Sequence, residues 1–434
     1  MNDKWMLYMR GSVTFGLGLA IITLLARWVT GNTILSSPQT LIQYGIAGSI
    51  GYAIAGGLAF FFLGLVAKRV RRSFPEAITI GDVLKEKLLP SYYHTFILML
   101  LFMGAYALMV QFYAAGTLFY YAIPQLPLIG FGGFLLLVIY FGGYGGLKKL
   151  TSLSFYSVVM IFLTTILLPI YSYLQNGISP IYDGVKLYHP YLFFMGSHET
   201  VWFVSAAILV FTGQILTDSA TWMRIFVTKP EKIGLAFQST GLIWATVPMA
   251  LLALLLFAIS GKSFDHVYLL IQTMLQALDA SFLMIIFVFF CLIAMLTASS
   301  SELHGWTSLL IKNVWLEKSL TDKQITQYRH LSVWLLAFIL FVIVAIVFPS
   351  SFSLLFFFGN LYASLIPAVM YILITEHRTG PAPTIIVAIG SVIGIVSHLS
   401  LHSFFSIWAS FLSACLLFIA FYLFNLQKYK KPMK

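Results

Sequence analysis

About twelve stretches of the chain are almost entirely apolar and long enough to cross a bilayer as helices, which takes about 20 residues each. These stretches of the 434-residue sequence are rich in Leu, Ile, Phe and Val and carry few or no charges. They are continuously apolar, whereas strands of membrane barrels alternate over about 10 residues. The pattern therefore predicts an all-α integral membrane protein. We expect spans near residues 11–35, 44–67, 93–122, 128–146, 152–174, 200–223, 233–260, 280–311, 330–348, 352–375, 383–400 and 404–426.

The low content of charged residues excludes several classes of protein. Only 9% of the residues are charged and 60% are hydrophobic, whereas a soluble domain carries about 25% charged residues. A water-soluble enzyme, a disordered chain and a nucleic-acid binder with a charged surface are all inconsistent with this composition. The two cysteines, Cys291 and Cys415, lie in apolar runs, so the sequence indicates no disulfide framework.

The net charge of +11 is distributed unevenly among the connecting segments. Cytoplasmic loops of membrane proteins carry an excess of Lys and Arg. Placing the N-terminus inside puts almost every basic residue in an inner segment: only Lys186 and Lys262 fall in outer loops, and Arg27 lies within a span. We therefore predict a multi-pass protein of the plasma (inner) membrane with both termini in the cytoplasm.

The first and sixth predicted spans are interrupted by glycine and polar residues, at 26–33 and 211–219. Irregular backbone at membrane depth is tolerated where it lines a cavity. Two interrupted spans at corresponding positions of two halves indicate an inverted-repeat transporter with its substrate between the breaks. We predict a ten-helix, five-plus-five core over 1–378, followed by two additional helices and a basic cytoplasmic tail over 379–434. The alternative is a pair of ordinary glycine-kinked helices whose hydroxyl groups pack against neighbours.

Three ionisable residues fall deep within predicted spans, where charge is costly and usually functional. Arg27 and Asp218 lie at the two breaks and Glu302 lies in the eighth span. We expect Arg27 and Asp218 to be paired, because the breaks face each other in such a core. Arg27 then either binds an anionic substrate or replaces a coupling cation, or the pair is purely structural. Arg224 and Glu231 are expected to be solvated at the cytoplasmic end.

The eighth span contains small and hydroxyl residues over about three turns, from 294 to 305. Hydroxyl and carbonyl oxygens are the ligands that a small, hard cation prefers. The same face is also typical of close helix packing without any ion. Glu302 on this helix is a candidate proton carrier, or is neutralised by His304 or by water.

No catalytic constellation is indicated, and we predict that the chain is not an enzyme. Ser301 and His304 are three residues apart on a helix, which does not make a triad. The glycine-rich segment 142–146 lacks the strand and the Lys-Ser/Thr pair of a phosphate-binding loop. We expect it to form a tight turn between the fourth and fifth spans.

Several short motifs resemble those of a known transporter family. These motifs are Ala26–Gly31 with Thr33–Leu35, Tyr44–Gly48, Lys68–Arg72, Thr79–Leu84, Gly145–Lys148, Arg224 with Lys229–Lys232, and Ala294–Leu303. Over roughly residues 16–375 the chain resembles the sodium:solute symporters, and more broadly the amino acid–polyamine–organocation superfamily with the leucine-transporter fold. The resemblance implies a ten-helix core with discontinuous first and sixth helices.

The resemblance also implies a sodium site between the first and eighth helices. Carried over to this chain, its positions are Ala26, Val29, Ala294 and Thr297, with Ser301 one turn further along. Ala298 departs from the pattern, which expects Ser or Thr. Ser154 stands where many members have an Asp that supports a second sodium, and Arg27 places a cation beside the site. Sodium and a proton are both candidate coupling ions, these departures favour transport without obligatory sodium, and no other cofactor is expected.

The function predicted from these features is secondary active transport of a small polar solute by alternating access. The alternatives are a proton-coupled or uncoupled exchanger on the same fold, and a transporter-like sensor or assembly protein that moves nothing. The expected partners are the solute and the lipid bilayer, without nucleic acid; the oligomeric state is not predicted. The expected substrate-binding residues are Arg27, Trp28, Asn32, Gln111, Gln214, Asp218 and Asn360.

Overall fold

The computed structural model describes residues 3–261, 270–278, 281–315, 321–347, 358–401 and 404–430. Within these ranges the regular elements are all helices, and the only β interactions are two isolated bridges. The prediction of an all-α protein is confirmed. Lys262 and residues 352–357, which begin the predicted tenth span, lie outside the described residues.

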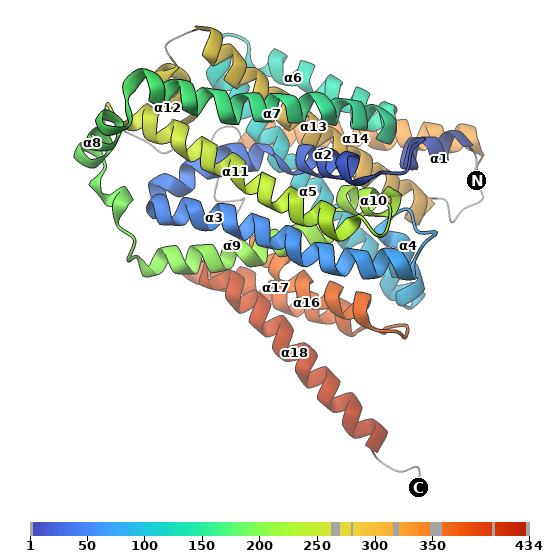
Figure 1. Cartoon of the computed structure of the whole chain (residues 1–434). Coiled ribbons are helices and arrows are strands. Elements are labelled where there is room, and N and C mark those ends of the chain that lie inside the picture. Colours follow the sequence, from blue (N-terminus) through green and yellow to red (C-terminus); the bar gives the residue numbers. More distant parts are fainter. Residues whose placement is uncertain are drawn as a thin grey trace.

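The first half of the chain forms the helices at the top and centre of Figure 1. They are α1 (Asp3–Arg10), α2 (Leu17–Trp28), α3 (Gly31–Ser73), α4 (Ile80–Lys87), α5 (Pro90–Ala122), α6 (Pro127–Val138), the π-helix η1 (Ile139–Gly145), α7 (Gly146–Asn176), α8 (Ile178–Tyr188) and the 3₁₀ helix η2 (Pro190–Phe193).

The second half continues the bundle and then forms its lower edge in that view. Its helices are α9 (His198–Thr217), α10 (Ser219–Val227), α11 (Ile233–Ile259), α12 (Leu270–Ala277), α13 (Ser281–Leu310), the π-helix η4 (Ile311–Trp315), α14 (Asp322–Val347), α16 (Gly359–Ile374), α17 (Ala382–Leu401) and α18 (Phe405–Lys430).

Nine helical segments among the described residues are long and apolar enough to cross a membrane. Two of these segments each cover parts of two neighbouring predicted spans. Within them, Gly45 and Gly146 interrupt the helical path with φ values of 67° and 66°. Glycine adopts this backbone without a steric penalty. It is also needed for space, since a Cβ on Gly45 would lie 2.8 Å from the carbonyl oxygen of Leu192. With these turns and the shorter helices α2 and α16, the helices account for the predicted arrangement of about twelve spans.

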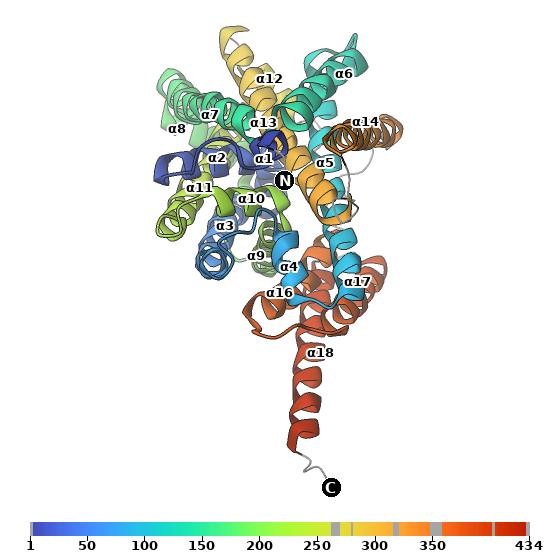
Figure 2. The same ribbon diagram turned by 90° about the vertical axis from the view of Figure 1, so that its right-hand side faces the viewer.

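The helices pack so that the interrupted ones lie in the interior. Figure 2, viewed from one end, shows α10 and α13 near the middle, α2 between α7 and α11, and α17 and α18 at one edge. Helix α3 packs against α9 and α11, whereas α13 packs against α5 and α7. The last two helices contact each other and α16, and α18 extends away from the bundle (Figure 1).

Both predicted breaks are present, and each is closed by a side chain that caps the next helix. Between α2 and α3, Val29 and Thr30 have extended backbone, and the Thr30 hydroxyl accepts a hydrogen bond from the backbone N–H of Thr33. Between α9 and α10, Asp218 is extended and its carboxylate caps α10. Such caps satisfy amide donors that the start of a helix leaves unpaired.

Candidate functional site

The two breaks face each other and are joined by an ion pair. Arg27, in the last turn of α2, donates from Nη2 to Oδ1 of Asp218 across 2.8 Å. Their exposed fractions are only 3% and 6%. Each charge therefore depends on the other, since an unpaired charge at this depth would be strongly destabilising.

A second carboxylate reaches the same guanidinium from a third helix. Arg27 Nη2 also donates to Oε2 of Glu302 on α13. Glu302 lies beside α5 at Gly104, where an added Cβ would be 3.2 Å from Glu302 Oε1. The three residues Arg27, Asp218 and Glu302 form what we term the charged cluster, in which one cation serves two acidic groups.

Asp218 is both an ion-pair partner and a helix cap. Its Oδ2 accepts hydrogen bonds from the backbone N–H of Thr221, at 2.9 Å, and from the Thr221 hydroxyl. That hydroxyl in turn accepts from the indole N–H of Trp28, at 2.8 Å. Carboxylates near a helix N-terminus are stabilised in their charged form. This chain of hydrogen bonds connects the end of α2 to the start of α10.

Arg224 is buried in the same region, so the prediction that it is solvated is wrong. Only 1% of its surface is exposed. Its guanidinium donates to the carbonyls of Thr23 (3.1 Å) and Ala220 (2.9 Å) and to the hydroxyl of Ser301 (2.8 Å). The reason is that α10 is short and every one of its residues is buried, so Arg224 lies inside the bundle. Glu231, in contrast, is exposed as predicted.

A pocket opens beside the breaks and is lined largely by aromatic and amide side chains. Its cavity volume is about 70 Å³, and the space including its open mouth is about 770 Å³. We call it the aromatic pocket, and its lining is Asn32, Ser36, Gln39, Thr40, Gln43, Tyr44, Tyr52, Tyr106, Val110, Phe203, Ala207, Val210, Phe211, Gln214, Tyr362, Phe404 and Ile407.

A much smaller cavity, of about 10 Å³, adjoins the charged cluster. We call it the charged cavity, and its lining is Arg27, Met103, Gly104, Ala107, Gln214, Thr217, Asp218, Glu302 and Tyr362. Gln214 and Tyr362 line both spaces. The aromatic pocket therefore adjoins the charged cluster at the last turn of α9.

The predicted substrate residues divide into two groups. Asn32 and Gln214 line the aromatic pocket, and Arg27, Asp218 and Gln214 line the charged cavity. The others line neither space: Trp28, Gln111 and Asn360.

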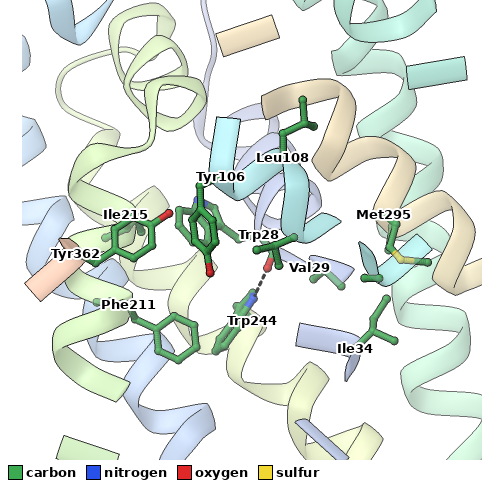
Figure 3. Close-up of a cluster of buried hydrophobic side chains, with 14 of the residues drawn as sticks. Trp28, Val29, Ile34, Tyr106, Leu108, Phe211, Ile215, Trp244, Met295 and Tyr362 are labelled. Carbon is green, nitrogen blue, oxygen red and sulfur yellow. Dashed lines mark hydrogen bonds between the residues drawn. The ribbon is translucent and has the colours of Figure 1, made fainter. Parts of the chain in front are cut away.

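These three make contacts between helices instead. The Trp28 carbonyl accepts from the indole N–H of Trp244 at 2.7 Å (Figure 3). Gln111 Oε1 accepts from the first amide of α3, that of Gly31, at 2.7 Å. The backbone carbonyl of Asn360 accepts from Ser410 on α18. All three thus help to hold the breaks or the outer helices in place.

The aromatic part of the pocket was not predicted from the sequence. Tyr106, Phe211 and Tyr362 come from three different helices, and Figure 3 shows them grouped with Trp244 around the break. A signal did exist on α3, where polar residues recur at 32, 36, 39 or 40 and 43 with helical spacing. Such a polar stripe on an otherwise apolar helix indicates a face turned to a cavity.

The proposed sodium positions are buried around the first break and on α13. Ala26, Val29, Ala294 and Thr297 are all fully buried. The Thr297 hydroxyl donates to the Ile293 carbonyl at 2.7 Å within its own helix, which leaves its lone pairs available. Ser301 accepts from Arg224, so a cation already binds this hydroxyl.

The positions carried over from the resemblance offer about four oxygens, three backbone carbonyls and one hydroxyl, where about five or six are expected for a sodium ion. Ala298 contributes no side-chain oxygen. Ser154, at the second implied sodium position, donates its hydroxyl to Leu150 at 2.7 Å. The described residues also contain no cluster of His, Cys, Asp and Glu that could hold a metal ion.

No family model matches the chain, but curated relatives and solved structures do. "Probable urea active transporter 1" of Schizosaccharomyces pombe is 22% identical over 247 residues, covering 53% of this chain and 37% of the relative. "Probable urea active transporter 3" of the same organism is 24% identical over 249 residues, covering 54% and 37%. The matched region therefore spans well under half the length of these relatives.

Solved transporters match over nearly the whole chain. A Na⁺-coupled sialic acid symporter in an outward-open state has a TM-score of 0.75 at 14% identity, covering 95% of this chain and 90% of its own. The nucleobase-cation-symport-1 transporter Mhp1, in a closed conformation with bromovinylhydantoin, has 0.62 at 13%, covering 94% and 92%. MhsT in complex with L-phenylalanine has 0.55 at 14%, covering 93% and 99%.

These structural neighbours differ in the solutes named for them, so their shared feature is the architecture. At this level of identity the likeness shows the fold, and the resemblance to the sodium:solute symporters stays a prediction. The broken first and sixth helices and the extent of the match lead to one conclusion: this chain is an integral, multi-pass membrane protein with the leucine-transporter fold.

Proposed function

We propose that this protein is a secondary transporter that moves a small polar solute across the membrane by alternating access. The observation that carries the proposal is the junction of the aromatic pocket and the charged cavity at the two helix breaks, through Gln214 and Tyr362. A solute entering the pocket thereby comes next to residues of α3, α9 and α16. Movement of α2 and α10 about their breaks would open the opposite side.

The ion pairs suit this cycle because they connect the parts that must move. Arg27 links α2 to the break at Asp218 and to α13, while Arg224 links α10 to α2 and α13. Charge-assisted hydrogen bonds of this kind are directional, so they favour a few discrete arrangements of the helices. The proposed core comprises 1–378, with 379–434 as an addition at its edge.

We further propose that transport does not require sodium. The expected positions offer about four oxygens where about five or six are expected for sodium, and Ala298 and Ser154 depart from the residues that the resemblance implies. Arg224 instead binds carbonyl and hydroxyl oxygens of α2, α10 and α13. Unlike a sodium ion, this positive group is part of the chain and cannot leave the site. Glu302 and Asp218 remain the groups that could exchange a proton.

The proposal is tested by uptake into proteoliposomes containing the purified protein. A solute panel would include urea, which appears in the names of the relatives, and the compounds named with the structural neighbours. We expect saturable uptake of at least one neutral solute, lost in Asp218→Asn and retained in the exposed control Glu231→Gln. Folded protein that takes up no solute would instead support a sensor or assembly role.

A further inference from the structure

We propose that the aromatic pocket selects an uncharged, flat solute carrying amide-type hydrogen-bond donors and acceptors, and discriminates against carboxylates and ammonium ions of the same size. This inference rests on the proposed transport function and names its substrate class. It follows from the residues that line the pocket, from the ion pairs that the nearby charged residues already form, and from the Tyr52 hydroxyl.

The lining described for the pocket contains aromatic rings and amides but no charged side chain. Aromatic rings from α3, α5, α9 and α16 offer faces and edges on which a flat molecule can stack. The amides of Asn32, Gln39, Gln43 and Gln214 each present donors and an acceptor. A solute with its own amide groups would pair with them in both directions.

The rings of the pocket are held in place by contacts with one another and with Phe358. Tyr106 stacks on Phe358 with centroids 3.8 Å apart, and Tyr362 is tilted by 52° at 6.3 Å from Tyr106. Across the pocket, Tyr52 meets Phe211 edge-on at 5.1 Å. Figure 3 shows Tyr106, Tyr362 and Phe211 converging on one region. Rings held by such contacts provide preorganised surfaces, which reduces the entropic cost of binding.

A buried hydroxyl at the pocket wall is poorly satisfied by its described neighbours. Tyr52 is 5% exposed and lines the pocket. Its hydroxyl lies near Thr33 and Ser36 but makes no hydrogen bond of good geometry within the described residues. Unpaired buried polar groups are costly, and a carbonyl oxygen of the solute would satisfy this donor.

The nearby charges disfavour an ionised solute. Arg27 is already shared by Asp218 and Glu302, so a carboxylate approaching the base of the pocket would meet two groups of its own sign. An ammonium ion would lose its hydration among uncharged side chains, and the charges of Asp218 and Glu302 are already balanced by Arg27 and by Arg224, which binds the neighbouring Ser301. Burial of an uncompensated charge is far more costly than burial of a hydrogen-bonded amide.

Binding of charge-matched molecules to the purified protein in nanodiscs tests this selectivity without requiring transport. Benzamide, benzoate and benzamidine share a flat shape and differ in charge, and acetamide, acetate and acetamidine repeat the series at smaller size. We expect a neutral member to bind at least about 10-fold more tightly than both its charged counterparts, by calorimetry. Preference for a charged member, or no binding by either amide, would overturn the proposal.

A charge placed in the pocket should invert the order. Gln214→Glu is expected to favour the amidine over the amide, and Gln276→Glu, the same substitution at an exposed position of α12 away from this pocket, should leave the order unchanged. Gln43→Glu at the exposed mouth serves if Gln214→Glu does not fold. An unchanged order in a folded pocket variant would contradict the assignment. Uptake of a carboxylate by proteoliposomes would refute this inference while leaving transport itself established.

Discussion

At the scale of single residues, the charged cluster is the part of the structure where the residues depend most on one another. Removing Arg27 leaves Asp218 and Glu302 as two buried carboxylates without their cation. Breaking a buried ion pair costs about 3–5 kcal/mol. We therefore expect Arg27→Gln to lower the melting temperature in detergent markedly, and the triple variant Arg27→Gln, Asp218→Asn, Glu302→Gln to recover part of that loss.

The cycle built from these variants measures the coupling. Residues in direct contact give non-additive effects, whereas independent sites add. If the stability losses of Arg27→Gln and Asp218→Asn simply sum in the double variant, the ion pair makes no net contribution. Glu231→Gln, on the exposed side of the same region, is the control and should melt with the parent protein.

How far single residues could be predicted depended on the cost of burying them. Arg27, Asp218 and Glu302 stood out because charge within an apolar span is rare, and the structure brings all three together. Arg224 was misjudged because its position near a span end looks solvated in sequence. Its burial arises from the break at Asp218, which places α10 among α2, α4 and α13.

At the scale of elements, Arg224 connects α2, α10 and α13. Its replacement tests whether this arginine, rather than a sodium ion, supports transport. Lys has one compact ammonium in place of the planar guanidinium and cannot reach Thr23, Ala220 and Ser301 together. We expect Arg224→Lys to reduce uptake at least about 10-fold, equally in sodium and in choline at fixed pH. Parent uptake should also be equal in the two salts.

Thr297→Ala is the matched variant for the opposite outcome. Its hydroxyl bonds only within α13 among the described contacts, so we expect nearly unchanged uptake. A strong sodium requirement in the parent protein that disappears in Thr297→Ala would show that sodium binds at the first break, and would replace our proposal with sodium symport.

The helix α13, which Arg224 contacts through Ser301, also packs closely against η1. Gly142 in η1 packs directly on α13, where an added Cβ would lie 2.3 Å from the carbonyl oxygen of Ser300. We expect Gly142→Ala to destabilise the protein by about 1–3 kcal/mol, as overpacking does. Gly132→Ala on α6 has no atom within 4 Å of the new Cβ and should be neutral. Equal melting of the two variants would contradict the packing.

The elements themselves were largely predictable, because the signals that define them are local. Apolar length predicted the spans, and glycine with polar neighbours predicted the breaks, which the structure places at 29–30 and at 218. The segment 142–146 was expected to form a tight turn, but residues 142–145 lie in the π-helix η1 and only Gly146 leaves the helical backbone. The aromatic pocket could not be predicted in the same way, because Tyr52, Phe211 and Tyr362 meet only through packing of distant helices.

At the scale of the whole molecule, the remaining prediction is the orientation in the membrane, which follows from the distribution of basic residues. With the N-terminus inside, the start of α14 at Lys323 is cytoplasmic and the end of α8 at Lys186 is outside. Both side chains are exposed, so either position can carry a reactive cysteine after Cys291 and Cys415 are replaced by serine. We expect a membrane-impermeant maleimide to label Lys186→Cys in intact cells and Lys323→Cys only after permeabilisation. The orientation matters for function, because it makes the mouth of the aromatic pocket, near Tyr44 at the start of the second predicted span, face outward. Labelling of Lys323→Cys from outside would reverse the assigned orientation. The mouth of the aromatic pocket would then face the cytoplasm.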